Sequence, residues 1–192
     1  MLTVDGLGKR YGSRWLFRGL AFSLSQGDCL AVLGPNGSGK STLLKILSGL
    51  VPASEGSFRL DGDPRTALGY SALEQALYPN LTVREHLHFA ADLRGCEHRD
   101  DELLDVVGLA DAADLYSALL STGMKSRLRF ALAIQPRPDV LILDEPGASL
   151  DEQGRALVDS LVKEQTTRGA LLFASNDPAE RRLATHELRL ED

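Results

Sequence analysis

Apolar residues along the chain form unbroken runs at three places. These runs are CLAVLG at Cys29–Gly34, VLILDEP at Val140–Pro146 and GALLFAS at Gly169–Ser175. Each is apolar at nearly every position of its core and then gives way to glycine, acidic or polar residues. Strands that are buried on both faces have this pattern, which is typical of a parallel sheet covered by helices. We therefore predict three strands of a parallel core.

Alternating patterns occur nearer the start of the chain. The segment GSFRLDG, Gly56–Gly62, alternates apolar and polar residues and stops at Asp61-Gly62, which is typical of a strand followed by a tight turn. Together with LTVDGL near the start and LAFSLSQG at Leu20–Gly27, it predicts an antiparallel β piece beside the parallel core.

Helical periodicity dominates residues 80–137. Thr82–Gly95 begins with a threonine and carries Glu85 three positions later, the signature of a capping box. The segments DDELLDVVGL and STGMKSRLRFALAI are also helical in period, and DEQGRALVDSLVKEQ at Asp151–Gln165 has an apolar face. We expect an α/β core formed roughly by residues 1–79 and 138–192, interrupted by a helical lobe of roughly 80–137.

Composition and charge narrow the functional classes. The chain has 192 residues and the apolar content of a soluble globular domain, and its net charge of −6 argues against nucleic-acid binding, which needs a basic face. Its two cysteines, Cys29 and Cys96, do not suggest a disulfide framework and fit a reducing cytosol. No apolar run approaches the roughly 20 residues that span a bilayer. If the protein serves a membrane, we expect another chain to do the spanning.

Histidines cluster in the segment predicted to be helical. His86 and His88 precede Cys96-Glu97-His98, but this spacing matches no zinc pattern. We interpret these histidines as surface residues of a helix.

A phosphate-binding loop is predicted at GPNGSGKST, which follows the strand CLAVL and precedes the helical LLKILSGL. This strand–GxxxxGK[ST]–helix order lets glycine-rich backbone turn its N–H groups toward phosphates, next to the positive end of a helix. Lys40 is expected to reach the β- and γ-phosphates of ATP, and the Ser41 hydroxyl to bind Mg²⁺. The predicted loop consists of Gly34, Pro35, Asn36, Gly37, Ser38, Gly39, Lys40, Ser41 and Thr42.

Two acidic residues end the strand VLIL. Asp144 is placed at the carboxyl end of the strand, where open α/β sheets bind ligands, and is expected to hold Mg²⁺ through water. Glu145 follows directly and is expected to orient or deprotonate a water that attacks the γ-phosphate.

A third motif identifies a family. In LLSTGMKSRLRFALAI, Ser121 is placed to cap the helix that follows, so that its hydroxyl, the Gly123 N–H and the helix dipole form a second phosphate-binding end. Together with the phosphate loop and the acid pair, this segment resembles the signature sequence of the ATP-binding cassette (ABC) ATPases. The resemblance implies a P-loop NTPase (RecA-like) parallel core with a flanking antiparallel β subdomain and an inserted helical subdomain.

The same resemblance assigns further residues. Tyr11 matches the aromatic residue that stacks on adenine, and Ser149-Leu150-Asp151 matches the loop that contacts the opposite subunit. Two positions depart from the family pattern. Leu73 aligns where the family has a glutamine, although a slip of the loop would bring Gln75 there, and Asn176 stands in place of the switch histidine.

The resemblance implies the ATPase subunit of an ABC transporter, peripheral on the cytoplasmic face of the cell membrane. Two copies would bind ATP head to tail as a homodimer, and a membrane-spanning permease would dock near Leu77–Pro79. The segment LSTGMKSRL most resembles the signature sequence of the ATPase subunits of ABC exporters, including haem exporters. The alternative is a nucleotide-gated module that hydrolyses ATP poorly, suggested by Leu73 and Asn176 but opposed by Glu145. ABC ATPases acting on DNA or ribosomes, and P-loop kinases, fit less well.

Overall fold

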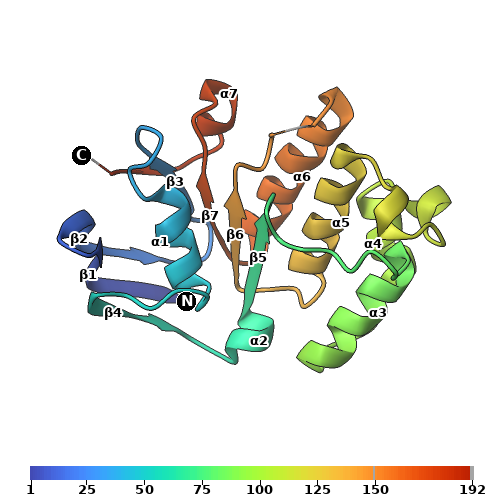
Figure 1. Cartoon of the computed structure of the whole chain (residues 1–192), viewed down its shortest axis with the longest axis horizontal. Helices are drawn as coiled ribbons and strands as arrows, with labels where there is room; N and C mark the ends of the chain where they lie inside the picture. Colours follow the sequence, from blue (N-terminus) through green and yellow to red (C-terminus); the bar gives the residue numbers. More distant parts are fainter. Residues whose placement is uncertain (149, 191–192) are drawn as a thin grey trace.

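Two β-sheets and a set of helices build the protein, and the computed structural model describes residues 1–148 and 150–190. The first sheet is antiparallel, with the strand order β2-β1-β4. Its strands are β1 (Leu2–Tyr11), β2 (Arg14–Leu24) and β4 (Glu55–Leu60). They lie at one end of the molecule, beside the N-terminus (Figure 1). The antiparallel β piece predicted from the alternating segments is thus confirmed.

The second sheet is parallel, with the order β5-β6-β7-β3-β8. It contains β3 (Cys29–Leu33), β5 (Leu68–Ala72), β6 (Val140–Asp144), β7 (Ala170–Ala174) and β8 (His186–Arg189). The three unbroken apolar runs form β3, β6 and β7, as predicted. A further strand, β8, follows β7 and pairs with β3. Since β8 lies at the sheet edge and is largely exposed, its sequence carries no buried-strand pattern.

Alternate residues of the parallel strands enter two different hydrophobic clusters. Leu30, Ile142 and Leu172 pack in one cluster with the antiparallel sheet and helix α1 (Lys40–Leu47). Leu141 and Phe173 point the other way, into a cluster with the remaining long helices. Helices and the antiparallel sheet therefore cover both faces, which explains why the central strands are apolar up to Asp144 at the end of β6.

The long helices begin close to the predicted positions. They are α3 (Val83–Arg94), α4 (Asp100–Val106), α5 (Thr122–Ile134) and α6 (Glu152–Arg168). The capping box of α3 is present: the Glu85 N–H donates to the Thr82 hydroxyl at 3.1 Å, and the Thr82 N–H donates to the Glu85 carboxylate at 2.7 Å. Short helices α2 (Pro64–Ala67), α7 (Pro178–Arg181), η1 (Ala110–Ala112) and η2 (Ser117–Leu119) complete the fold.

The helical lobe is packed directly on the parallel sheet. Helix α5 lies against β5, and α3 lies against α5. Val83 of α3 and Leu128 of α5 belong to the same hydrophobic cluster as Leu141 and Phe173 of the sheet. The lobe and the sheet therefore share one core.

One histidine of the lobe is buried, contrary to the expectation of surface positions. His86 is only 3% exposed. Its Nε2 accepts a hydrogen bond from the Tyr78 N–H at 2.9 Å, and its Nδ1 lies 2.7 Å from the Thr82 carbonyl oxygen. A proton on Nδ1 satisfies both contacts, so His86 ties the preceding loop to the start of α3. His88 and His98 are exposed, as expected.

Among the described residues, no helix combines the length and the apolar content that crossing a bilayer requires.

Candidate nucleotide-binding site

The predicted phosphate loop connects the end of β3 to the start of α1. Gly37 and Gly39 have φ values of 85° and 100°, a region that side chains other than glycine rarely adopt. A Cβ atom on Gly39 would lie 3.1 Å from the ring of Phe17 and 3.2 Å from Leu16, both in β2. A side chain at position 39 would therefore be strained by the backbone conformation and crowded by β2.

Polar groups of this loop are held close to its backbone. Lys40 is 7% exposed, and its ammonium donates to the carbonyl oxygens of Gly34 at 2.7 Å and Pro35 at 3.1 Å. The Ser38 hydroxyl is buried and has no hydrogen-bond partner within the described chain. A buried donor of this kind is costly unless a ligand accepts from it. Thr42 follows in the first turn of α1. The loop thus presents a cation and hydroxyl donors, which suits an anion.

The two predicted Mg²⁺ ligands are brought together from separate elements. The Ser41 hydroxyl, in α1, donates to Asp144 Oδ1, at the end of β6, at 3.1 Å. Asp144 is 8% exposed, and burial raises the pKa of its carboxyl, while the hydrogen bond from Ser41 partly opposes that rise. Hydroxyl and carboxylate oxygens are the ligands that Mg²⁺ prefers, so this pair fits the ion.

Glu145 has a backbone conformation that is uncommon for its residue type. Its φ is 53°, and its N–H donates to the Ala174 carbonyl of β7 at 2.9 Å. Non-glycine residues rarely adopt positive φ, and such positions often occur at functional sites. The Glu145 side chain lines a cavity of about 190 Å³ together with Ser41 and Asp144. The predicted catalytic carboxylate and the predicted metal ligands therefore share one cavity.

Two charged residues of this cavity were missed by the sequence reasoning. Lys45 and Glu74 form an ion pair, and both line the cavity beside Leu73. Gln75 lines instead a larger cavity of about 660 Å³, into which its neighbour Glu74 also reaches. The shift of the loop that would place Gln75 in the position of Leu73, beside Asp144, is not observed. Lys45 could have been found from its position four residues after Ser41, on the same face of α1.

Asn176 lies at the phosphate loop. It follows β7, and its side-chain amide donates to the Asn36 side-chain oxygen at 3.1 Å. The end of β7 thus brings an amide to the phosphate loop.

Glu180, a few residues further on, was not predicted from the sequence. Burial raises the pKa of its carboxyl, and a hydrogen bond with Ser175 partly opposes the rise.

Tyr11 ends β1 and is exposed. It pairs with Arg14 across the hairpin, and the Lys9 ammonium lies 4.9 Å from the centre of its ring. Leu16 and Phe17, which a Cβ atom on Gly39 would approach, follow on the same hairpin. The contact of Tyr11 with adenine remains a prediction.

Ser121 and Gly123 lie at a second site, away from the phosphate loop. The Ser121 hydroxyl caps α5 by accepting from the Met124 N–H at 3.2 Å. Ser121 and Gly123 line a cavity of about 430 Å³ together with Asp151, which caps α6. No residue of the phosphate loop lines this cavity, and α1 and α5 lie on opposite sides of β5 and β6 (Figure 1). Ser149, which the resemblance places in the intersubunit loop, lies outside the described residues.

Comparison with known protein families shows to which family the chain belongs. The model of the family described as "ABC transporter" matches residues 17–148, which include the phosphate loop, the signature segment and the acid pair. The chain belongs to the ABC transporter family.

Several curated ABC proteins are similar in sequence. The chain is 36% identical to the "uncharacterized ABC transporter ATP-binding protein YxlF" of Bacillus subtilis, over 92% of this chain and 62% of that protein. It is 35% identical to the linearmycin resistance ATP-binding protein of the same organism, over 88% of this chain and 58% of that protein. The chain thus spans about 60% of the length of these ABC relatives. The cytochrome c biogenesis ATP-binding export protein of Bradyrhizobium diazoefficiens is 38% identical, over 88% of this chain and 87% of that protein.

Solved structures confirm the ABC ATPase fold. A structure described as the ATP-binding subunit of an ABC transporter superposes with a TM-score of 0.91 at 28% identity, over 99% of this chain and 85% of that chain. A dimeric ATP-binding cassette bound to ADP and phosphate superposes with a TM-score of 0.88, over 100% of this chain and 94% of that chain. Because the second is 21% identical, it bears on the fold alone. The predicted P-loop NTPase architecture is confirmed.

Proposed function

We propose that the chain binds ATP with Mg²⁺ and hydrolyses it to drive an ABC transporter. The observation that carries this proposal is the cavity in which Ser41, Asp144 and Glu145 meet, beside the buried ammonium of Lys40. Hydrolysis of a phosphoanhydride needs a cation at the phosphates, a metal site and a carboxylate near the attacking water. All three are contributed here by the ends of neighbouring core elements.

Each residue has a distinct role in the proposed reaction. Lys40 binds the β- and γ-phosphates, and glycine-rich backbone holds them at the start of α1. Ser41 directly and Asp144 through water would hold Mg²⁺, which would supply positive charge that offsets the charge of the phosphates. Glu145 accepts a proton from water, or orients it, as it attacks the γ-phosphate. Asn176 donates a hydrogen bond at the same end of the site.

A second copy of the chain completes the site in this proposal. Ser121 and Gly123 form a phosphate-binding end that lines a different cavity from the phosphate loop. Head-to-tail pairing of two copies would bring the signature cavity of one against the phosphate loop of the other.

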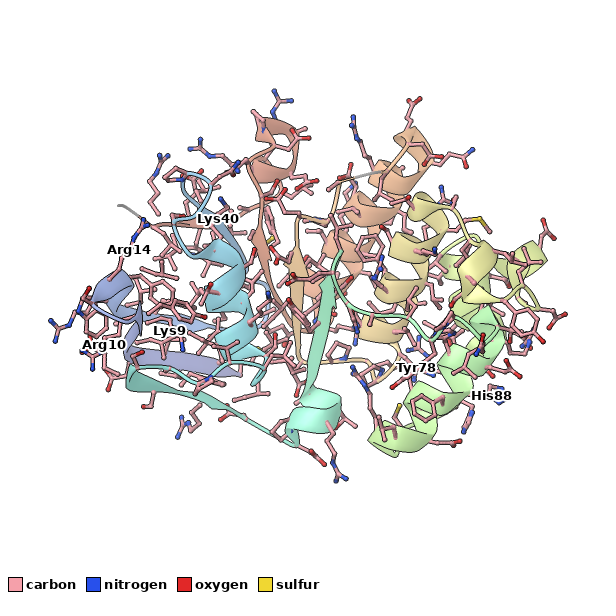
Figure 2. The ribbon with its side chains drawn as sticks, viewed as in Figure 1. Lys9, Arg10, Arg14, Lys40, Tyr78 and His88 are labelled. Carbon is pink, nitrogen blue, oxygen red and sulfur yellow. The ribbon has the colours of Figure 1, made fainter. Side chains whose placement is uncertain are left out.

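A membrane-spanning permease is the proposed partner outside the dimer. Leu77, Tyr78 and Pro79 lie in the loop before α3, and Tyr78 is exposed and packs edge-on against the exposed Phe89, with ring centres 5.5 Å apart. Tyr78 lies beside the helical lobe, on the other side of the parallel sheet from the antiparallel sheet (Figure 2). An exposed aromatic pair suits a docking surface. We place the protein in the cytoplasm, peripheral on the inner face of the membrane, and favour export because relatives include an export protein.

The substitution Glu145→Gln tests the proposal. Removing the carboxylate while keeping the shape should lower steady-state phosphate release by roughly 100-fold or more and should trap an ATP-bound dimer in size-exclusion chromatography. Glu97→Gln, which neutralises an exposed carboxylate in the helical lobe, is the matched control and should leave the rate unchanged. Equal hydrolysis by wild type and Glu145→Gln would refute the role of Glu145. Wild-type protein that dimerises with ATP but hydrolyses no faster than Glu145→Gln would support the nucleotide-gated module instead.

A further inference from the structure

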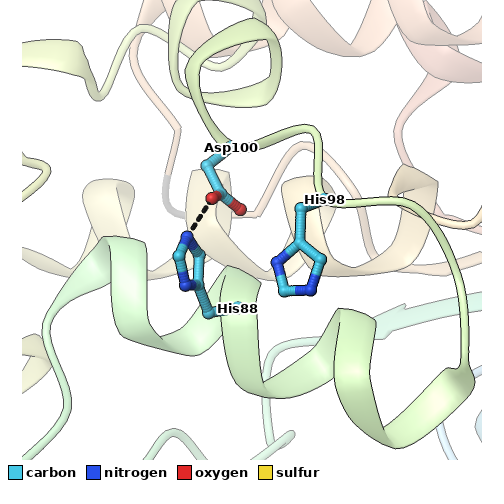
Figure 3. A group of neighbouring side chains, drawn as sticks. All are labelled: His88, His98 and Asp100. Atoms are coloured by element: carbon cyan, nitrogen blue, oxygen red, sulfur yellow. Dashed lines mark ion pairs between the residues drawn. The ribbon is translucent and has the colours of Figure 1, made fainter.

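Three potential metal ligands converge at the surface of the helical lobe. His88 lies on α3, His98 lies in the loop between α3 and α4, and Asp100 is the first residue of α4. One ligand atom from each residue lies within 4.8 Å of the other two. The three side chains point toward one another across the α3–α4 junction (Figure 3).

Asp100 is poised to accept a cation. Its side chain is only 9% exposed, and one carboxylate oxygen, Oδ2, is paired with His88 Nε2. The other oxygen, Oδ1, is buried and has no hydrogen-bond partner within the described chain. A buried carboxylate oxygen without a donor is costly, and a bound cation would remove that cost.

His98 has the surroundings of a metal-ligating histidine. Its Nε2 lies 2.9 Å from Asp92 Oδ1, which leaves Nδ1 for the cluster. Metal-binding histidines commonly donate their second ring nitrogen to a carboxylate, which fixes the ring and strengthens the ligand. The rings of His98 and His88 are nearly perpendicular, with centres 4.9 Å apart, so neither ring blocks the nitrogen of the other.

The dimensions of the cluster fit a small ion after modest side-chain rotation. Three atoms that are no more than 4.8 Å apart share a point within about 2.8 Å of each, compared with roughly 2.0–2.2 Å for bonds from zinc to histidine or aspartate. His88 and His98 are 53% and 45% exposed, so both rings can move inward by the remaining distance. Two imidazoles and one carboxylate suit Zn²⁺ better than Mg²⁺ or Ca²⁺, which prefer ligand sets made of oxygen alone.

We propose that His88, His98 and Asp100 form a Zn²⁺ site that ties α3 to the start of α4. Water would complete the coordination on the exposed side. The site lies in the helical lobe, and its ligands are separate from Ser41 and Asp144 of the nucleotide-binding site. Sequence spacing did not suggest it, because the chain reverses at Gly95, which adopts a left-handed conformation at the end of α3 and brings His98 back beside His88.

Zinc titration of the metal-free chain of 192 residues tests the site, with no nucleotide present. Competition with a chromogenic chelator measures affinity and stoichiometry, and thermal denaturation measures stabilisation by the ion. We expect one zinc ion per chain and a zinc-dependent rise in Tm. His88→Ala and His98→Ala should each weaken binding by roughly 100-fold, and Asp92→Asn, which removes the carboxylate behind His98, by about tenfold.

Three control variants separate this site from other zinc ligands. His186→Ala removes an exposed histidine that lies 3.8 Å from a carboxylate oxygen of Asp28 but belongs to no group of three potential metal ligands among the described residues. Cys96→Ser removes the nearby free thiol, and Asp144→Asn removes the predicted Mg²⁺ ligand. All three should bind zinc as wild type does. Equal affinity in wild type, His88→Ala and His98→Ala would overturn the proposal, as would loss of binding in any of the three controls.

Discussion

Replacing Asn176 by histidine is the sharpest test of how the end of β7 contributes to hydrolysis. Asn176 donates through its side-chain amide to Asn36 of the phosphate loop at 3.1 Å, so its side chain lies at the phosphate-binding edge of the sheet. An amide can donate a hydrogen bond but cannot take up a proton, whereas imidazole can become positively charged. Asn176→His therefore exchanges a neutral donor for one that can be charged.

The expected gain follows from the difference between neutral and charge-assisted hydrogen bonds. A neutral hydrogen bond contributes roughly 1 kcal/mol and one to a charged group roughly 2 kcal/mol. A difference of about 1 kcal/mol that is present only in the transition state corresponds to about a fivefold change in rate. Asn176→His should thus raise kcat about fivefold, and Asn176→Ala should lower it by a similar factor.

Steady-state phosphate release at saturating ATP and Mg²⁺ measures both effects. Asn36→Ala is the companion variant, because it removes the partner of Asn176 and tests whether the contact between them positions the amide. It should lower kcat less than Asn176→Ala does. Identical kcat values for wild type, Asn176→His and Asn176→Ala would show that this side chain does not act on the reacting phosphate, and the reasoning would be wrong.

Other sites give predictions of the same kind. Gly39→Ala should weaken nucleotide binding more than Gly37→Ala does in a fluorescent-nucleotide titration. Both glycines have positive φ, which strains alanine by about 1–2 kcal/mol, but of the two only Gly39 has neighbours within 4 Å of an added Cβ. Equal losses of affinity would contradict a role for crowding. Asp144→Asn should unfold at a higher temperature than wild type at pH 8 in the absence of nucleotide. Because the folded protein raises the pKa of the Asp144 carboxyl, its ionisation at high pH destabilises the wild-type protein. The difference in unfolding temperature between the two proteins should therefore vanish as the pH falls toward the ordinary carboxyl pKa. A difference that does not change with pH would exclude this explanation. Thr82→Ala removes the hydroxyl that accepts from the Glu85 N–H, and should lower the free energy of unfolding by about 1 kcal/mol in urea denaturation; unchanged stability would mean that water replaces the cap.

The parallel core could be predicted only where strands are buried on both faces. β3, β6 and β7 are central or nearly central, and they are apolar except for Asp144 at the end of β6. β5 carries Gly69 instead, because a Cβ there would lie 2.2 Å from the Ala133 carbonyl of α5. Close packing of α5 thus requires a glycine in β5 and interrupts the run of apolar residues that would predict a buried strand. β8, at the edge of the sheet, has no such run.

Contiguous motifs of the site were predictable because their chemistry is local. The phosphate loop, the acid pair and the Ser121 cap each depend on a few neighbouring residues. The ion pair between Lys45 and Glu74 and the contact of Asn176 with Asn36 join elements that are distant in sequence. Such contacts follow from the order of strands in the sheet, which periodicity does not reveal.

The packing of the helical lobe supports the proposal that two copies are needed. Helix α5 is held on β5, and its Leu128 belongs to the same buried cluster as Phe173 of the sheet. Moving α5 relative to the sheet would expose this apolar surface, at a cost that grows with the area uncovered. The position of Ser121 relative to Asp144 is therefore fixed by the core, with the two residues facing different cavities. A signature cavity that faces away from the phosphate loop of its own chain is what we expect if, as proposed, it serves the nucleotide of a second subunit.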